Sequence, residues 1–205
     1  MKSINLIVAI GFLISTSAVL DAQTSASASA VAHAQIIRPI HLTWENPLEF
    51  GTLIPPTSGT GYATMDVTGM GANSVTGHGV CPLTPTMSGG AGRTDLGPNT
   101  PSACTFLVEG ESNFLFGVDL PPLEVIVIPM HRIGPGTPVL VLDNFQTNLA
   151  GSDPAFGAGS GTGHGGTGTL TGGYKYFAVG ARLTLPAGTP PGEYSGQFNV
   201  RVFYN

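Results

Sequence analysis

The chain has 205 residues, of which 41% are hydrophobic and only 9% are charged, and its formal net charge is −5. Low charge with this hydrophobic content is the reverse of a disordered composition, so we expect a folded chain of about one domain. Only 7 Lys and Arg residues stand against 12 Asp and Glu, and they form no basic patch, which argues against a nucleic acid or an anionic membrane as partner.

The N-terminus has the pattern of a secretory signal peptide. A positively charged start precedes the apolar run Ile4–Leu20, and small residues follow it. Cleavage is predicted after Ala22, which makes residues 1–22 the signal peptide; Ala18 and Ala28 are alternative sites. A retained membrane anchor is the rival interpretation, but the apolar run is short for a span and contains polar residues. We therefore expect export to the periplasm, the cell surface or the extracellular space.

Apolar residues after the signal alternate with a period of two, which predicts strands rather than helices. The alternation begins in Ser25–Gln35, where alanine occupies every second position, and continues through Ile36–Thr43. It recurs in Tyr62–Val67, Cys104–Glu109, Phe114–Leu120, Leu123–Ile128, Val139–Phe145, Tyr176–Leu185 and Gln197–Asn205. Gly110–Asn113 lies between two of these segments and predicts a hairpin turn.

Residues 23–205 are predicted to form a single all-β domain. Short alternating strands with Gly and Pro turns favour an antiparallel immunoglobulin-like β-sandwich, with a jelly roll as the alternative. Two stretches are predicted as long loops, Met87–Pro101 and the Gly/Ser/Thr-rich Gly151–Gly173, which is expected to be a mobile surface loop.

The only two cysteines, Cys81 and Cys104, are predicted to form a disulfide. An exported chain folds in an oxidising compartment, where two cysteines most simply pair. The bond would close a loop of roughly 22 residues and stabilise the fold by about 3 kcal/mol in the chain-entropy model. Two isolated cysteines supply too few ligands for a metal site, and no C-x-x-C motif suggests redox chemistry.

No motif in the sequence predicts a catalytic residue, a cofactor or a metal site. Gly161–Gly166 formally matches G-x-G-x-x-G, but a dinucleotide site needs a preceding strand and a following helix, and neither is predicted there. The histidines lack metal-binding spacing: His33, His41, His78, His131 and His164.

The remaining candidates for a catalytic or sugar-binding site are carboxylates and aromatic residues. A glycosidase-like carboxylate pair would have to come from Glu109, Glu111, Asp119 and Glu124, of which the first two flank the predicted hairpin turn, where charge is expected anyway. Trp44 with Tyr62 is the aromatic pair that a sugar-binding platform would use, although a single Trp in a β domain more often packs.

Four segments together resemble a family of secreted bacterial proteins, the domain-of-unknown-function 4402 family. They are Pro47–Leu53, similar to D-L-x-F-G-x-I with Pro47 in place of the usual Asp; Pro101–Gly110; Tyr176–Thr184; and Gly192–Tyr204, similar to G-x-Y-x-G-x-F-x-V-x-V-x-Y. The resemblance spans nearly the whole mature chain and implies export and a β-sandwich, without an established activity. The cysteines and the long loop between them depart from the family pattern.

The layout also looks like that of chaperone–usher and spore-coat-type pilus subunits. These share an alternating N-terminal extension and an alternating C-terminal strand with a penultimate aromatic residue, which is Tyr204 here. In strand addition, an extended segment fills another subunit's open sheet edge. Whether Ala26–Ile37 pairs within its own chain is left open by the sequence.

The expected function is that of an exported, non-catalytic cell-surface or fimbria-like structural subunit. Its expected partners are itself or other surface subunits, joined through strand addition, with no integral membrane segment after cleavage. A secreted adhesin or carbohydrate-binding module is the alternative.

Overall fold

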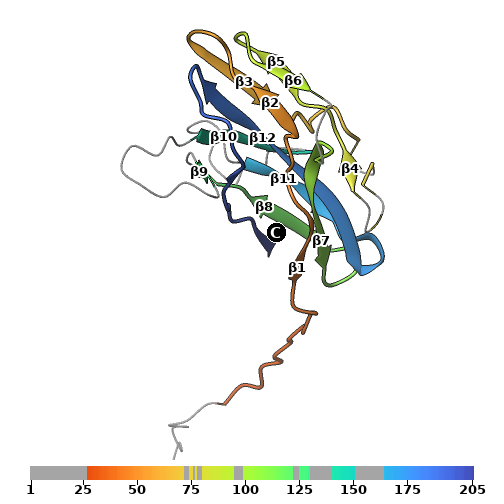
Figure 1. The fold of residues 1–205 in the computed structure, drawn as a ribbon. Helices are drawn as coiled ribbons and strands as arrows, with labels where there is room; N and C mark the ends of the chain where they lie inside the picture. The colour runs from red at the N-terminus through yellow and green to blue at the C-terminus, as the bar shows by residue number, and fades with distance from the viewer. Residues whose placement is uncertain are drawn as a thin grey trace, which may run out of the picture. The chain divides into compact units, whose positions relative to one another are not determined.

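The computed structural model describes residues 27–71, 74–75, 77, 80–94, 99–121, 125–129, 140–150 and 164–205. The compact unit Ile37–Asn205 contains every strand of the described part of the chain, and the residues up to Ile36 form a separate unit. The regular elements in the described part are strands, apart from one 3-10 turn at Thr171–Gly173 (Figure 1). None of the described residues belongs to a helix that is long and apolar enough to cross a membrane.

The larger sheet is built around the long strand β12, Tyr174–Pro186. Along one edge β12 pairs antiparallel with β7 (Ser102–Glu109) and then with β3 (Thr60–Thr64), and along the other with β10 (Leu140–Thr147). The order through the sheet is β1-β7-β12-β10-β9-β13, so β1 (His41–Asn46) is a terminal strand. The other members are β4 (Cys81–Pro82), β5 (Thr86–Ser88), β9 (Val125–Pro129) and β13 (Tyr194–Ser195).

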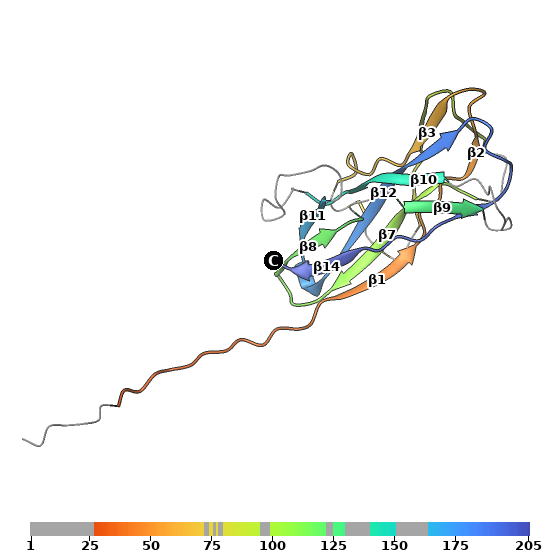
Figure 2. The ribbon, with the colours of Figure 1, turned by 90° about the vertical axis from the view of Figure 1, so that its left-hand side faces the viewer.

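A smaller sheet lies against the larger one and has the order β11-β8-β14 (Figure 2). Its strands are β8 (Leu115–Asp119) in the centre, with β11 (His164–Thr169) and β14 (Arg201–Tyr204) paired antiparallel on either side. A separate pair joins β2 (Thr52–Ile54) to β6 (Gly92–Thr94). The antiparallel β-sandwich predicted from the alternating strands is therefore confirmed.

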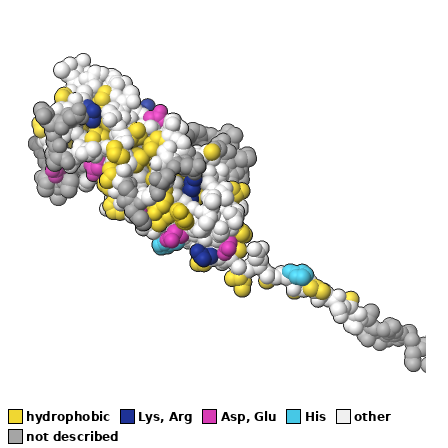
Figure 3. All heavy atoms as spheres, turned by 90° about the vertical axis from the view of Figure 1, so that its right-hand side faces the viewer, with side chains coloured by type: hydrophobic (Ala, Val, Ile, Leu, Met, Phe, Trp, Pro, Cys, Tyr) yellow, Lys and Arg dark blue, Asp and Glu magenta, His cyan; other side chains and the backbone are white. Residues whose placement is uncertain are grey.

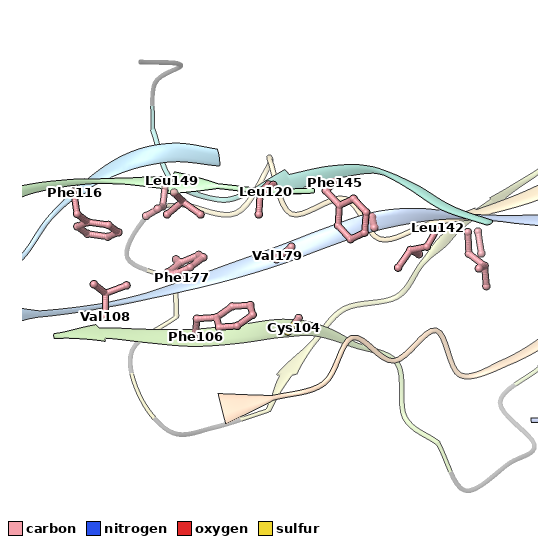
Figure 4. Close-up of a cluster of buried hydrophobic side chains, with 14 of the residues drawn as sticks. Cys104, Phe106, Val108, Phe116, Leu120, Leu142, Phe145, Leu149, Phe177 and Val179 are labelled. Carbon is pink, nitrogen blue, oxygen red and sulfur yellow. The ribbon is translucent and has the colours of Figure 1, made fainter. Parts of the chain in front are cut away.

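The main core lies between the two sheets and consists of side chains from alternate strand positions (Figure 4). Phe177 is fully buried at its centre, stacked on Phe106 with ring centroids 5.3 Å apart and tilted against Phe116 at 6.5 Å. Burying such a side chain contributes about 1.5–3 kcal/mol, and aromatic pairs add to it. The three rings come from β12, β7 and β8, so they hold the two sheets together.

The larger sheet also buries its other face under a second, smaller core. Met65 and Val67 follow β3 and are fully buried, and they pack with Tyr176 and Ala178 of β12. Figure 3 shows hydrophobic side chains gathered between a few scattered charged ones on the face that it presents. Because β7 and β12 are covered on both sides, apolar residues predominate on both faces of these strands.

The predicted hairpin between Cys104–Glu109 and Phe114–Leu120 is wrong. β7 and β8 belong to different sheets, so the chain crosses the sandwich at this turn. The turn makes its hydrogen bonds with the 170–173 turn: Gly110 N donates to Gly173 O at 2.9 Å, and Asn113 N donates to Leu170 O at 2.8 Å. Strand length and turn composition could not distinguish a turn within a sheet from a crossing between sheets.

Both predicted long loops contain strands. Met87–Pro101 holds the end of β5 and all of β6, joined by Gly89 and Gly90 at φ of 65° and 80°. Of the predicted mobile loop Gly151–Gly173, residues 151–163 lie outside the described residues, but the following stretch is β11, which pairs with β8. Glycine composition concealed these strands because glycine is uncommon inside sheets.

Candidate functional site

The segment that precedes the sandwich is extended and exposed. None of the residues from Ser27 to Ile36 belongs to a strand, and every one of them is exposed. Two large hydrophobic side chains stand out, Val31 at 81% and Ile36 at 96% of full exposure. The predicted alternation therefore exists as a pattern, with alanines and then Ile36 at even positions, but the described part does not pair. Of the predicted strand Ile36–Thr43, only the part from His41 belongs to a strand, which continues to Asn46.

Two strands, β1 and β14, each end a sheet, and they lie next to one another. They belong to different sheets, and within the described part of the chain no strand pairs with the outer edge of either. We call the inward-facing apolar side chains along these two edges the seam. Ile40 and Leu42, from β1 and the residue before it, pack on the main core, and the register places Trp44 on the same face. The C-terminal segment contributes Phe198, Val200, Val202 and Tyr204.

The β1 side of the seam faces the main core but is incompletely covered. The register pairs Leu42 with Val108 and Trp44 with Phe106, which places both on the core face of the sheet. Leu42 is only half-buried, and Trp44 is 62% exposed. An exposed Trp beside a packed core indicates that the sandwich is not closed at this edge.

The C-terminal side of the seam runs along one edge of β9 and β8. β13 pairs with β9 and β14 pairs with β8, so the last residues follow these two consecutive strands in the opposite direction. Phe198 packs on the buried Phe145 with ring centroids 5.0 Å apart, yet it stays half-buried like Val200. The alternation predicted for Gln197–Asn205 is confirmed, because Phe198, Val200, Val202 and Tyr204 all pack on the main core.

At one end the seam is closed by a set of hydrogen bonds that we call the clasp, formed by Arg38, Glu111 and Tyr204. The Tyr204 hydroxyl accepts a hydrogen bond from Glu111 N at 2.6 Å and donates one to Arg38 O at 2.7 Å. Arg38 N donates to Glu111 Oε2 at 2.9 Å. Tyr204 was singled out from the sequence only as a penultimate aromatic residue. Arg38 was missed, and the adjacent Pro39, which cannot donate to a ladder, was the available signal.

The structure differs from the predicted disulfide: Cys81 and Cys104 are both free thiols. Cys81 is opposite Ala103 in the β4–β7 pair and packs on the second core, whereas Cys104 is the next residue along β7 and belongs to the main core. Successive residues of a strand point to opposite faces, so the two thiols lie on different sides of the sheet. A disulfide needs the two Cβ atoms to approach each other, which this arrangement opposes.

The two thiols should differ in reactivity. Burial raises the pKa of Cys104 to about 12, and it also raises the pKa of the half-buried Cys81. Alkylation of native protein at pH 8 should therefore label Cys81 first and leave Cys104 unlabelled until the protein is unfolded, because the thiolate is the reactive form. Peptide mass mapping with and without denaturant measures this. Two thiols that resist labelling until a reductant is added would instead restore the disulfide.

The other candidates from the sequence are not brought together. His33 and His41 are exposed, His164 begins β11, and His78 and His131 lie outside the described residues. Among the described side chains, no three His, Cys, Asp or Glu residues form a group that could hold a metal. Of the four carboxylates, Glu111 is engaged in the clasp, Glu109 ends β7, Asp119 ends β8, and Glu124 lies outside the described residues.

Trp44 and Tyr62, the aromatic pair considered for sugar binding, lie on different strands and make different contacts. Trp44 lies on β1 and donates from Nε1 to Asn46 O at 2.8 Å. Tyr62 lies on β3 under the guanidinium of Arg182, 5.0 Å from its ring centroid, and Arg182 makes a bidentate pair with Asp143 at 2.8 Å for both bonds. Arg182 therefore covers one face of the Tyr62 ring, and a sugar could not stack on that face.

The glycine motif at 161–166 does not have the surroundings of a nucleotide site. Its described residues, His164 to Gly166, begin a strand, and the short 3-10 turn after that strand is no phosphate-binding helix. A Cβ on Gly166 would lie 2.7 Å from the carbonyl oxygen of Leu149, so the backbone here packs closely against the segment that contains Leu149.

Taken together, the fold and the seam define an all-β sandwich protein with an incompletely covered edge and an exposed N-terminal extension. The family model described as Domain of unknown function (DUF4402) matches residues 40–204, and the chain belongs to this family. Comparison with curated proteins and with solved structures gave no significant match.

Proposed function

We propose that this protein is an exported, non-catalytic structural subunit of a bacterial cell-surface assembly, comparable to a fimbrial subunit, and that it associates with copies of itself or with other surface subunits by strand addition. The observation that carries the proposal is the coexistence of an exposed, alternating extension and an incompletely covered sandwich edge in one chain. The N-terminal apolar run supports export.

The exposed extension and the incompletely covered sandwich edge are each unfavourable in an isolated molecule. A terminal strand with exposed apolar side chains is a template for pairing with another chain, and proteins that remain monomeric usually protect such edges. Ile36 and Trp44 are both largely exposed, although residues of these types are usually buried or half-buried. Backbone hydrogen bonds between the extension of one molecule and the edge of another would cover both features at once.

The test is to remove residues 23–32 from the mature chain and to measure assembly size by light scattering. Mature protein of residues 23–205 should form oligomers whose mass rises with concentration, and the deletion should convert them to monomers. Since the deleted residues precede the compact unit that starts at Ile37, circular dichroism and melting temperature should not change.

Two outcomes would count against the proposal. Unchanged oligomers after the deletion would show that the extension does not drive assembly. A monomer both before and after would favour the alternative, a secreted adhesin or carbohydrate-binding module, in which the exposed Trp44 would be the first residue to test by glycan binding.

A further inference from the structure

We infer that the face of the larger sheet that points away from the smaller one binds the guanidinium group of an arginine side chain from another protein, held by the ring of Tyr174 and the carboxylate of Glu109. The inference goes beyond the proposed assembly function, because it names a different partner and a site made of side chains rather than strand edges. It requires neither the N-terminal extension nor the seam.

Three exposed side chains form a row across this face. The register places Glu109 of β7 opposite His41 of β1 on one side and opposite Tyr174 of β12 on the other. Directly opposed residues share a face, with Cβ atoms about 4.5–5.5 Å apart. All three are exposed, and Tyr174 retains 53% of its full exposure. A group that stacks on the Tyr174 ring is therefore within reach of the Glu109 carboxylate.

The second core holds the Tyr174 ring in place. Tyr176 lies two residues further along β12, so both rings project from the same face of the strand, and Tyr176 is buried in the second core. The two rings meet edge to face, with centroids 6.1 Å apart and an angle of 78° between their planes. A ring that is already ordered loses little conformational freedom when a partner stacks on it.

The electrostatic surroundings of these rings favour a cation. Burial raises the pKa of the Tyr176 phenol, and Glu45, Tyr174 and Glu109 raise it further. The negative potential that disfavours a phenolate at this place favours a positive charge beside the same rings. Lys175 lies between the two tyrosines in the chain, but successive residues of a strand point to opposite faces, so its side chain leaves from the other side of the sheet.

The same molecule already shows how a tyrosine and a carboxylate hold a guanidinium. Arg182 lies over Tyr62, 5.0 Å from its ring centroid, and donates two hydrogen bonds of 2.8 Å to the carboxylate of Asp143. Tyr174 and Glu109 supply the same two components, a ring face and a pair of carboxylate oxygens. Arginine suits them better than lysine, because its planar group both stacks on aromatic faces and forms bidentate pairs.

A second copy of this chain is a poor source of the guanidinium. Arg182 is bound to Asp143, and Arg201 lies over Phe203 of its own molecule, 5.8 Å from the ring centroid. The formal net charge of the chain is −5, which favours encounter with a basic partner over encounter with another copy. The occupant is therefore an arginine in a basic segment of a different protein.

The experiment titrates N-acetyl-arginine amide into mature protein of residues 23–205 at constant ionic strength and follows the backbone NMR signals of Tyr174 and Glu109. N-acetyl-citrulline amide is the matched ligand, since citrulline has nearly the same planar shape without the charge. The arginine probe should bind in the millimolar range and about 10-fold more tightly than the citrulline probe, through a cation–π contact and an ion pair at an exposed site. N-acetyl-lysine amide should bind more weakly than the arginine probe.

Two variants with matched controls locate the site. Tyr174→Leu removes the ring and should weaken binding of the arginine probe about 3-fold, whereas Tyr174→Phe retains the ring and should preserve binding. Glu109→Gln should remove most of the preference for arginine over citrulline. Its control is Glu193→Gln, at an exposed carboxylate immediately before β13, which should leave that preference unchanged. Melting temperatures should be the same for all four variants, because the substituted residues are exposed.

Several results would overturn the inference. Equal affinity of the arginine and citrulline probes would show that charge plays no part, and equal affinity of the lysine probe would show that stacking plays none. Unchanged binding of the arginine probe in Tyr174→Leu or in Glu109→Gln would place the site elsewhere. Smaller oligomers of Tyr174→Leu in light scattering would make a second copy the occupant instead of a different protein. A parent chain that is monomeric would refute the proposed assembly but would leave the titration unaffected.

Discussion

Replacing Gly168 with valine should destabilise the sandwich by about 3 kcal/mol or more, or prevent folding, because the site has no room for a side chain. Gly168 of β11 is paired with Phe116 of β8, and a Cβ at this position would lie 2.6 Å from two ring atoms of Phe116. Phe116 is fully buried and packs against Phe177, so its ring cannot move aside without opening the main core. Chemical denaturation of the purified variant measures the loss.

The matched control for this substitution is the neighbouring Thr169→Val. Thr169 is exposed and lies on the same strand, so valine there should change the free energy of unfolding by no more than about 0.5 kcal/mol. A Gly168→Val variant as stable as the control would show that β11 does not pack on β8 in solution. It would also restore the interpretation of the whole glycine tract as an unpacked loop.

This glycine tract shows where sequence reasoning reached its limit. The alternating apolar strands were identified because their side chains report which face is buried, as in β12, where the pattern located a core strand within two residues of its start. In β11 the information lies in the absence of side chains, since each glycine allows a ring or a carbonyl group of a neighbouring segment to approach closely. A composition rich in Gly, Ser and Thr looks the same for a loop and for such a strand.

The candidate site could be predicted from the sequence only in part, for a similar reason. The alternation of the extension and of the C-terminal strand could be predicted, because each is a local pattern of period two. The clasp could not, since it joins Arg38 to Glu111 and Tyr204, which are 73 and 166 residues further along the chain. The structure does not show the predicted disulfide, and cysteine count and compartment say nothing about which side of the sheet each thiol occupies.

Removing the Tyr204 side chain should have the second large effect, because it anchors the end of β14 to the segment that precedes β1. Tyr204→Ala should lower the free energy of unfolding by about 3 kcal/mol, through loss of the ring's packing on the main core and on Phe114, whose centroid lies 5.7 Å away. Tyr204→Phe keeps the ring and removes only the hydroxyl, so it should cost about 1 kcal/mol.

Tyr204→Phe measures the contribution of the clasp hydrogen bonds separately from the packing of the ring. In Tyr204→Phe the amide of Glu111 loses its acceptor and the carbonyl of Arg38 loses its donor, so exchange of the Glu111 amide hydrogen should quicken. Tyr174→Phe is the matched control, because Tyr174 is 53% exposed and its substitution should leave both stability and exchange unchanged. If the two Phe variants behave alike, the hydrogen bonds of the clasp contribute nothing to stability.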